Sequence, residues 1–146
     1  MDSALSIIGF YFTLIGFISG LFFTRLDNWY GQVREFSGEY SGELPEKKNT
    51  TDNCRKNRVT LMGLMESAPQ GSFITVGCLT TTLMFLSWGV PVNNAEINPF
   101  IYLWGPLLLT VLIYWSGGIF LLNKGYKKLN GIGKEIDKVL GPINAG

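Results

Sequence analysis

Lysine and arginine are distributed very unevenly along this sequence. All twelve of them lie in two segments, 25–58 and 124–138. Three long apolar runs, 4–24, 72–91 and 99–123, contain no Lys, Arg, Asp or Glu. Membrane proteins show this separation, because a charged side chain is costly inside a bilayer and cytoplasmic loops retain Lys and Arg beside the spans. The pattern therefore predicts an all-α membrane protein with three transmembrane helices.

The first run, 4–24, is long enough to cross a bilayer. As a helix it would extend roughly 31 Å, at about 1.5 Å per residue, against a hydrocarbon core of about 30 Å. A cleaved signal peptide is the alternative, but no cationic segment precedes the run and no small-residue cleavage pattern follows it. Because Asp2 precedes the run and Arg25 follows it, we expect the N-terminus on the outer side.

The other two runs are expected to form a helical hairpin, since only residues 92–98 separate them. This turn contains Glu96 and no cation, as expected of an outer loop. The basic segments then belong to a cytoplasmic loop, 25–71, and to a cytoplasmic tail, 124–146. Periodicity alone does not separate a span from a buried helix of a soluble bundle, but three charge-free runs favour one integral membrane domain, 1–146. We expect a multi-pass protein of the cell or inner membrane, with its C-terminus in the cytoplasm.

Apolar side chains recur at helical spacing at the start of the cytoplasmic loop and again in the tail, where Leu129, Ile132 and Ile136 form a stripe. Both patterns predict amphipathic surface helices. The stretch 41–57, which follows the first stripe within the cytoplasmic loop, is polar, contains Pro45 and is expected to be irregular. For the loop helix, a position at the lipid interface is favoured over filling the groove of a partner. Its interfacial candidates are Trp29, Tyr30, Val33 and Phe36.

The sequence lacks most of the residues on which catalytic and metal sites depend. It has no histidine, which excludes imidazole ligands for haem, zinc or copper and nucleophilic pairs that need histidine. Its two cysteines, Cys54 and Cys78, lie apart in the predicted topology, and no phosphate-binding glycine loop or nucleic-acid motif is present. Spans without ionisable residues also disfavour a proton-driven pump acting alone. We therefore expect no enzyme activity, no cofactor and no nucleic-acid partner.

The first span carries small residues on one face. Gly16 and Gly20 form a GxxxG step, and Thr13 and Gly9 extend it toward the N-terminus. Such a face lets a second helix approach closely in a membrane. Because glycine is common in membrane helices, a true interface and an incidental pattern carry equal weight at this stage. These four residues are the helix-packing candidates of the first span.

The hairpin contains polar side chains that need partners inside the apolar region. Thr80 and Thr81 of the second span can bond to a neighbouring helix or to their own backbone carbonyls, and the second option is slightly favoured. Tyr114 of the third span should lie at about the depth of these threonines. We predict that its hydroxyl bonds to Thr80 or Thr81, or else to Thr110 one turn back. Pro106 should kink the third span.

Two functional classes fit these features. The first is a small non-catalytic multi-pass membrane subunit that packs against a larger membrane protein complex and stabilises or regulates it. The second is a homo-oligomeric pore or stator-like component of an ion-conducting membrane assembly. The expected partners are membrane lipids and either other integral membrane subunits or copies of the chain itself. A membrane enzyme would need a partner to supply its catalytic groups.

The second class is suggested by a resemblance in layout. An outer N-terminus, a cytoplasmic loop after the first span and a closing hairpin with the threonine-rich stretch Gly-Cys-Leu-Thr-Thr-Thr at 77–82 resemble the TolQ/ExbB/MotA stator family. That family has a Gly-Leu-Leu-Gly-Thr stretch in its hairpin. The resemblance implies a homo-oligomeric assembly, but the loop and tail here are short and no functional residue of the family maps onto this chain.

Overall fold

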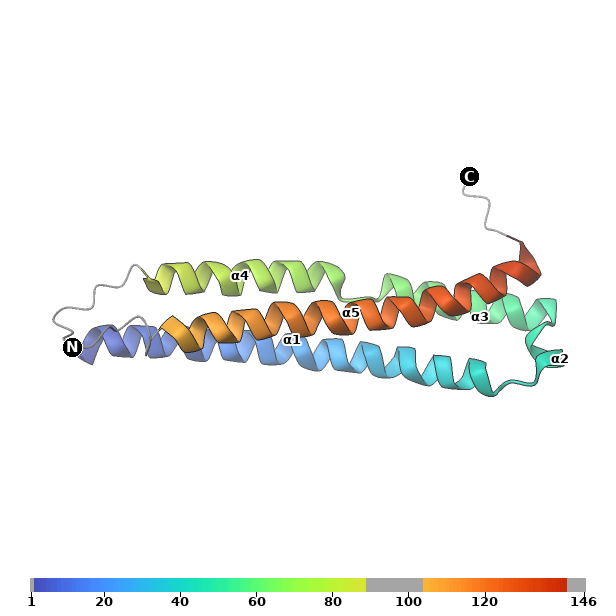
Figure 1. Ribbon diagram of the computed structural model, residues 1–146, viewed down its shortest axis with the longest axis horizontal. Coiled ribbons are helices and arrows are strands. Elements are labelled where there is room, and N and C mark those ends of the chain that lie inside the picture. Colours follow the sequence, from blue (N-terminus) through green and yellow to red (C-terminus); the bar gives the residue numbers. More distant parts are fainter. Residues whose placement is uncertain (1, 89–103, 142–146) are drawn as a thin grey trace. The chain divides into compact units, whose positions relative to one another are not determined.

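The computed structural model describes residues 2–88 and 104–141, which form five α-helices and no strands (Figure 1). Two of the helices are long and three are shorter. The predicted outer turn, 92–98, and the first residues of the predicted third span lie outside the described residues. The helices are α1 (Asp2–Gly42), α2 (Pro45–Lys48), α3 (Thr51–Glu66), α4 (Gln70–Trp88) and α5 (Gly105–Leu140).

The two long helices correct the predicted element boundaries. α1 runs without a break from the predicted first span into the predicted loop helix, and α5 does the same from the third span into the tail. The amphipathic surface helices are therefore not separate elements. The change in polarity near Arg25 does not interrupt the backbone, because no proline lies in residues 2–42 and an isolated glycine costs a helix only about 1 kcal/mol.

The prediction of an irregular stretch at 41–57 is wrong for most of its length. Pro45 opens the short helix α2, where a proline in the first turn is tolerated because its missing N–H would have no helical partner. α3 then begins at Thr51. Pro106 also lies in the first turn of the described part of α5, where a proline is tolerated, and the kink stays a prediction.

The buried side chains of α1 follow a seven-residue repeat. Two series occupy the buried face, and positions within each series are seven residues apart, as in helices that pack along a coiled-coil seam. The stripe that predicted a separate loop helix is the continuation of the stripe that begins in the first span. The first series is Ile8, Ile15, Phe22, Trp29 and Phe36, and the second is Ser19, Leu26, Val33 and Tyr40.

The chain divides into two compact units. Unit 1 comprises Met1–Arg25 and Gln70–Ile119, and unit 2 comprises Leu26–Pro69 and Phe120–Gly146. α1 and α5 contribute to both units, whereas α4 belongs to unit 1 and α2 and α3 belong to unit 2. Each unit has buried apolar side chains of its own.

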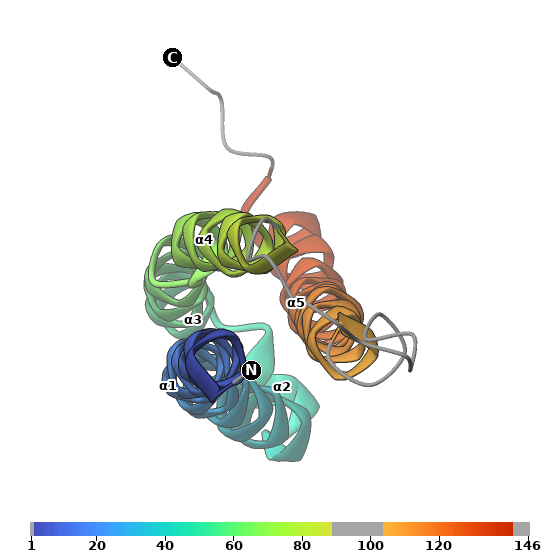
Figure 2. The ribbon, with the colours of Figure 1, turned by 90° about the vertical axis from the view of Figure 1, so that its left-hand side faces the viewer.

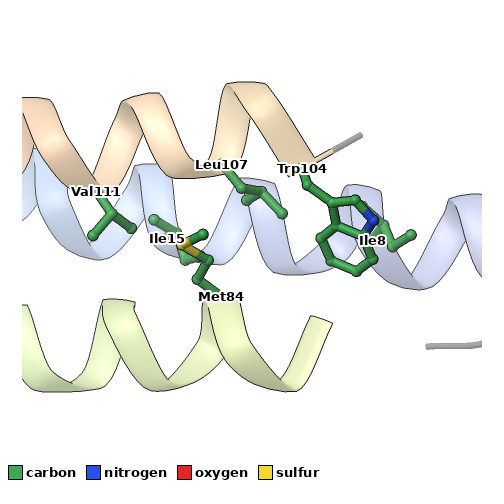
Figure 3. Close-up of a cluster of buried hydrophobic side chains, with 6 residues drawn as sticks. All are labelled: Ile8, Ile15, Met84, Trp104, Leu107 and Val111. Carbon is green, nitrogen blue, oxygen red and sulfur yellow. The ribbon is translucent and has the colours of Figure 1, made fainter. Parts of the chain in front are cut away.

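In unit 1, parts of α1, α4 and α5 surround a common interior (Figure 2). One buried cluster takes side chains from all three helices, as Figure 3 shows. Ile15 and Leu107 in this cluster are fully buried. The cluster consists of Ile8, Ile15, Met84, Trp104, Leu107 and Val111.

Aromatic rings in unit 1 lie directly on glycines of the neighbouring helix. The ring of Trp115 on α5 occupies the space that a Cβ at Gly77 would need, and the ring of Phe73 on α4 does the same at Gly118. Small residues permit this close approach of two helix backbones. The two contacts together set the distance and the register between α4 and α5.

In unit 2, the core joins parts of α1, α3 and α5. The ring of Trp29 lies against Gly125 of α5, leaving no space for a Cβ there, and its Nε1 donates a hydrogen bond to the carbonyl oxygen of Leu64 at 2.9 Å. Leu61 of α3 and Leu129 of α5 are buried in the same unit. Trp29 therefore links α1 to both α3 and α5.

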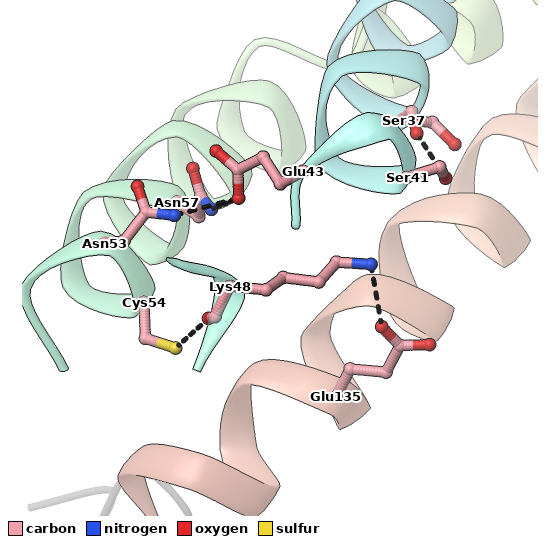
Figure 4. Close-up of polar contacts among 8 residues, drawn as sticks. All are labelled: Ser37, Ser41, Glu43, Lys48, Asn53, Cys54, Asn57 and Glu135. Carbon is pink, nitrogen blue, oxygen red and sulfur yellow. Dashed lines mark hydrogen bonds and ion pairs between the residues drawn. The ribbon is translucent and has the colours of Figure 1, made fainter. Parts of the chain in front are cut away.

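A polar network closes the end of unit 2 around α2 (Figure 4). A carboxylate oxygen of Glu43 accepts hydrogen bonds from Asn53 Nδ2 at 2.8 Å and from Asn57 Nδ2 at 3.4 Å. The Lys48 ammonium lies 3.9 Å from the Glu135 carboxylate and 4.1 Å from the centre of the Tyr40 ring. These contacts connect the end of α1 with α3, and α2 with α5.

Among the described residues, two helices are long and apolar enough to cross a membrane, Ser6–Gly42 in α1 and Gly105–Leu140. Only 22% of the most apolar stretch of the first helix and 28% of that of the second are buried within the chain. A core helix of a soluble protein would be mostly buried, whereas here large side chains such as Phe17 and Phe120 are more than half exposed. α4 is not one of this pair within the described residues.

Glycine substitutions should separate internal from external positions. We expect Gly118→Ala to destabilise the chain by about 1–3 kcal/mol, because the added methyl group overlaps the buried Phe73 ring. Gly16→Ala should leave stability unchanged or raise it by up to about 1 kcal/mol, because nothing lies near its Cβ position and alanine favours a helix. Thermal unfolding of both variants in mild detergent, followed by circular dichroism, measures the difference. Equal losses would contradict the packing described for Gly118.

Candidate functional site

The small-residue face of α1 points away from the core of unit 1. Gly9, Thr13, Gly16 and Gly20 are all exposed. At each of the three glycines an added Cβ would meet no other atom of the described chain within 4 Å. The structure thus brings all four predicted helix-packing residues of the first span onto one open face.

The one hydroxyl among these four residues, that of Thr13, already forms a hydrogen bond within α1. The Thr13 hydroxyl donates to the carbonyl oxygen of Gly9 at 2.9 Å, which is the usual bond of a threonine to the preceding turn. Large apolar side chains border the glycines, among them Phe12 and Phe17, which are 44% and 64% exposed. Large apolar side chains thus flank an exposed glycine face, at which another helix could come close to the backbone.

The glycines of this protein therefore fall into two classes. Gly77, Gly118 and Gly125 are covered by aromatic rings of the same chain, whereas at Gly16 and Gly20, as at most other described glycines, an added Cβ would meet no described atom within 4 Å. The first class is explained by the chain's own packing. The second class is not, and it is the class that carries the GxxxG step.

The hydroxyls of α4 bond to their own helix. Thr80 and Thr81 both donate to the carbonyl oxygen of Gly77, at 3.0 and 2.7 Å. The sequence left two options open, and the slightly favoured one, bonding to the helix's own carbonyls, is observed for both threonines. Thr81 also links two helices, because its hydroxyl oxygen accepts a hydrogen bond from Trp115 Nε1 at 3.3 Å.

Tyr114 does have a partner on α4, but not the one predicted. Its hydroxyl donates to the carbonyl oxygen of Phe73 at 2.8 Å, so the predictions of Thr80, Thr81 and Thr110 are wrong. The contacts of Trp115 with Gly77 and of Phe73 with Gly118 bring Tyr114 nearer to the start of α4 than equal helix midpoints predict.

Aromatic rings enclose the Tyr114 side chain, which is 1% exposed. Phe73 stacks on it with ring centres 5.3 Å apart, and Phe22 and Phe23 of α1 lie at 5.5 and 5.7 Å. Aromatic pairs at these separations stabilise a core beyond the area they bury. Tyr114 is therefore a packing residue at the centre of unit 1, which joins α1, α4 and α5.

The four interfacial candidates of the loop lie mainly inside unit 2. Trp29, Val33 and Phe36 are buried, and their positions in the seven-residue repeat explain why. Little of their surface is left for lipid. Tyr30 is part-buried, and the ammonium group of Lys124 lies 5.7 Å from the centre of its ring.

Ser19 is a buried polar residue that the sequence analysis does not predict. It occupies a core position of the repeat on α1 and is 6% exposed, and its hydroxyl has no hydrogen-bond partner among the described residues. The signal that could have revealed it is a hydroxyl at a place in the repeat where Ile15 and Phe22 are its buried neighbours along the helix. Its small volume leaves room for the large rings around it.

Two titratable side chains of unit 2, Cys54 and Tyr40, are buried and contact other residues of that unit. Cys54 is 1% exposed, and its Sγ donates to the carbonyl oxygen of Lys48 at 3.0 Å. Burial, together with the nearby Glu135 carboxylate, raises the pKa of Tyr40 to about 12. No group of three or more His, Cys, Asp or Glu side chains within the described ranges is placed to hold a metal ion.

Comparison with protein-family models, with curated proteins and with solved structures finds no match for this chain.

Removing the Tyr114 hydroxyl should weaken unit 1 slightly. We expect Tyr114→Phe to lower stability by about 0.5–1.5 kcal/mol, because one interhelical hydrogen bond is lost while the ring and its contacts remain. Tyr11→Phe is the matched control, since no described residue forms a hydrogen bond with its hydroxyl, and it should change stability by less than about 0.3 kcal/mol. Thermal unfolding in detergent compares the two. A Tyr114 variant as stable as the control would show that the bond to Phe73 contributes nothing.

Proposed function

We propose that this chain is a small non-catalytic multi-pass membrane subunit that packs against a larger membrane protein complex and stabilises or regulates it. The observation that carries the proposal is the open face of Gly9, Thr13, Gly16 and Gly20 on α1. Within the described chain no side chain covers this face, and its glycines have no role in the chain's own packing. A helix of another membrane protein, held close by such a face, would explain them.

The membrane placement rests on exposed apolar surface. Apolar side chains of unit 1 point outward from all three helices, as Phe10, Phe85 and Leu109 do. Water would disfavour so much exposed apolar surface, whereas lipid would not. The chain would lie with its N-terminus outside and its C-terminus in the cytoplasm of the cell or inner membrane.

α4 can serve as the second of the three spans in spite of its hydroxyls. It has 19 residues, which as a helix extend about 28 Å, close to a hydrocarbon core of about 30 Å. Thr75, Thr82 and Ser87 donate to carbonyls of the preceding turn, as Thr80 and Thr81 do. A hydroxyl that is already bonded costs less to place in lipid than an unbonded one.

Charge supports the orientation. Arg25 is the only Lys or Arg in the sequence of unit 1, so every other one belongs to unit 2. Cytoplasmic segments beside membrane spans retain Lys and Arg, which supports a cytoplasmic position for unit 2. There its polar end around Glu43 and Lys48 would be in water.

A homo-oligomeric pore or stator-like component is the alternative. The open glycine face could pair with the same face of a second copy as well as with a foreign helix. The partner on the glycine face decides between the two readings.

Enlarging the glycine face should release the partner. We expect a double substitution, Gly16→Leu with Gly20→Leu, to reduce the co-purified partner at least about tenfold, because the added side chains hold the two backbones apart. The chain itself should stay folded, since the space beside both glycines is open. The measurement is native mass spectrometry of tagged chain extracted from its own cells with mild detergent.

Ser116→Leu is the matched control, because it adds a similar side chain at an exposed site on α5. This variant should keep the partner. A heteromeric complex in the unsubstituted protein supports the accessory subunit, and a symmetric oligomer supports the pore or stator. A lone monomer, or a double variant that keeps its partner, would overturn the role of this face.

A further inference from the structure

A groove lies between α1 and α4 on the surface of unit 1. Its volume is about 460 Å³, within the range of sites that bind small molecules. Apolar side chains form most of its wall, including Ile18 and Leu21 of α1 and Val76 of α4. Leu21 is 59% exposed, so this side of the groove is open.

The groove has a cation at one end. Arg25 lines it together with Ser72, and Arg25 Nη1 donates to the Ser72 hydroxyl at 3.3 Å. The guanidinium forms no ion pair with any carboxylate in the described part of the chain. Because a guanidinium has five N–H donors, most of its capacity is available for another acceptor.

The surroundings of Arg25 add to the positive potential. α4 begins at Gln70, and the first turn of a helix carries unpaired N–H groups and a partial positive charge. Ser72 lies in that turn and faces Arg25. An anion placed there would meet the guanidinium, a hydroxyl and the start of a helix together.

We propose that this groove binds an anionic phospholipid of the cytoplasmic leaflet. The phosphate group would lie at Arg25 and Ser72, and one acyl chain would follow Leu21 and Ile18 toward the middle of the bilayer. The inference rests on the membrane placement in the proposed function, in which Arg25 ends the first span at the level of the headgroups. It does not depend on any protein partner.

Charge selects among the lipids. A phosphatidylcholine headgroup carries its own cation and has no net charge, whereas a phosphatidylglycerol headgroup is negative. An arginine without a carboxylate partner favours the negative headgroup. Near a membrane surface each such cation contributes about 1 kcal/mol, which corresponds to about fivefold in binding.

The test measures which lipid stays on the protein. The full chain is placed in nanodiscs with equal amounts of dioleoylphosphatidylglycerol and dioleoylphosphatidylcholine and released into mild detergent, and native mass spectrometry counts the bound lipids. We expect the unsubstituted chain to retain phosphatidylglycerol preferentially. Arg25→Gln should lower that retention at least about fivefold. Lys127→Gln, the same change of charge at an exposed site in unit 2, should lower it less than about twofold.

A second variant tests the acyl-chain part of the site. Thr75 lines the groove and is exposed, so Thr75→Leu should fill the groove without disturbing the core. Retention of phosphatidylglycerol should fall although Arg25 is intact. Competition with glycerol phosphate, which has the headgroup anion without an acyl chain, should not displace the lipid.

The outcomes separate this site from the proposed function. Equal retention of both lipids, or an Arg25→Gln variant that behaves like the Lys127 control, would overturn the lipid site. Displacement by glycerol phosphate would overturn the groove as the acyl-chain site. Selective loss of phosphatidylglycerol in Arg25→Gln supports the site, whether or not a partner protein accompanies the chain when it is purified from cells.

Discussion

The close seating of aromatic rings on glycines is the constraint on which the rest of unit 1 depends. Trp115 lies on Gly77, and Phe73 lies on Gly118, so the two helices α4 and α5 pack at one register only. That register brings the Tyr114 hydroxyl to a backbone carbonyl and Trp115 Nε1 to a threonine hydroxyl. In an environment without water, such bonds matter because an unbonded polar group has no other partner.

The packing of rings on internal glycines also bears on the exposed glycines of α1. The glycines Gly77 and Gly118 are covered by rings of the chain, whereas Gly16 and Gly20 lie on surface that the described chain does not pack against. The two proposed contacts are separate. Gly16 and Gly20 would meet a protein helix, and the groove that ends at Arg25 and Ser72 would meet a lipid. A small subunit could in this way be held both by its complex and by the membrane around it.

Much of the helical content could be predicted from the sequence, but the element boundaries could not. Hydropathy and charge change sharply at Arg25, and this change of polarity predicts the end of a helix there. The backbone hydrogen bonds of α1 do not depend on that change, and the seven-residue spacing that continues through Leu26 and Val33 was the better guide. The partner of Tyr114 could not be predicted, because the register depends on the contact of Gly77 with Trp115, which only the packed structure shows.

Membrane topology is the most direct test of the account, because it separates three spans from two. With Cys54 and Cys78 replaced by alanine, single cysteines introduced by Asn94→Cys and by Lys138→Cys can be reacted with a membrane-impermeant maleimide on intact cells. The account predicts that the cysteine at position 94 reacts from outside, whereas the one at 138 reacts only after the membrane is permeabilised. If α4 did not cross the membrane, the hairpin turn would lie inside and the tail outside. The reverse pattern of labelling, or labelling of both sites from outside, would contradict the three-span arrangement.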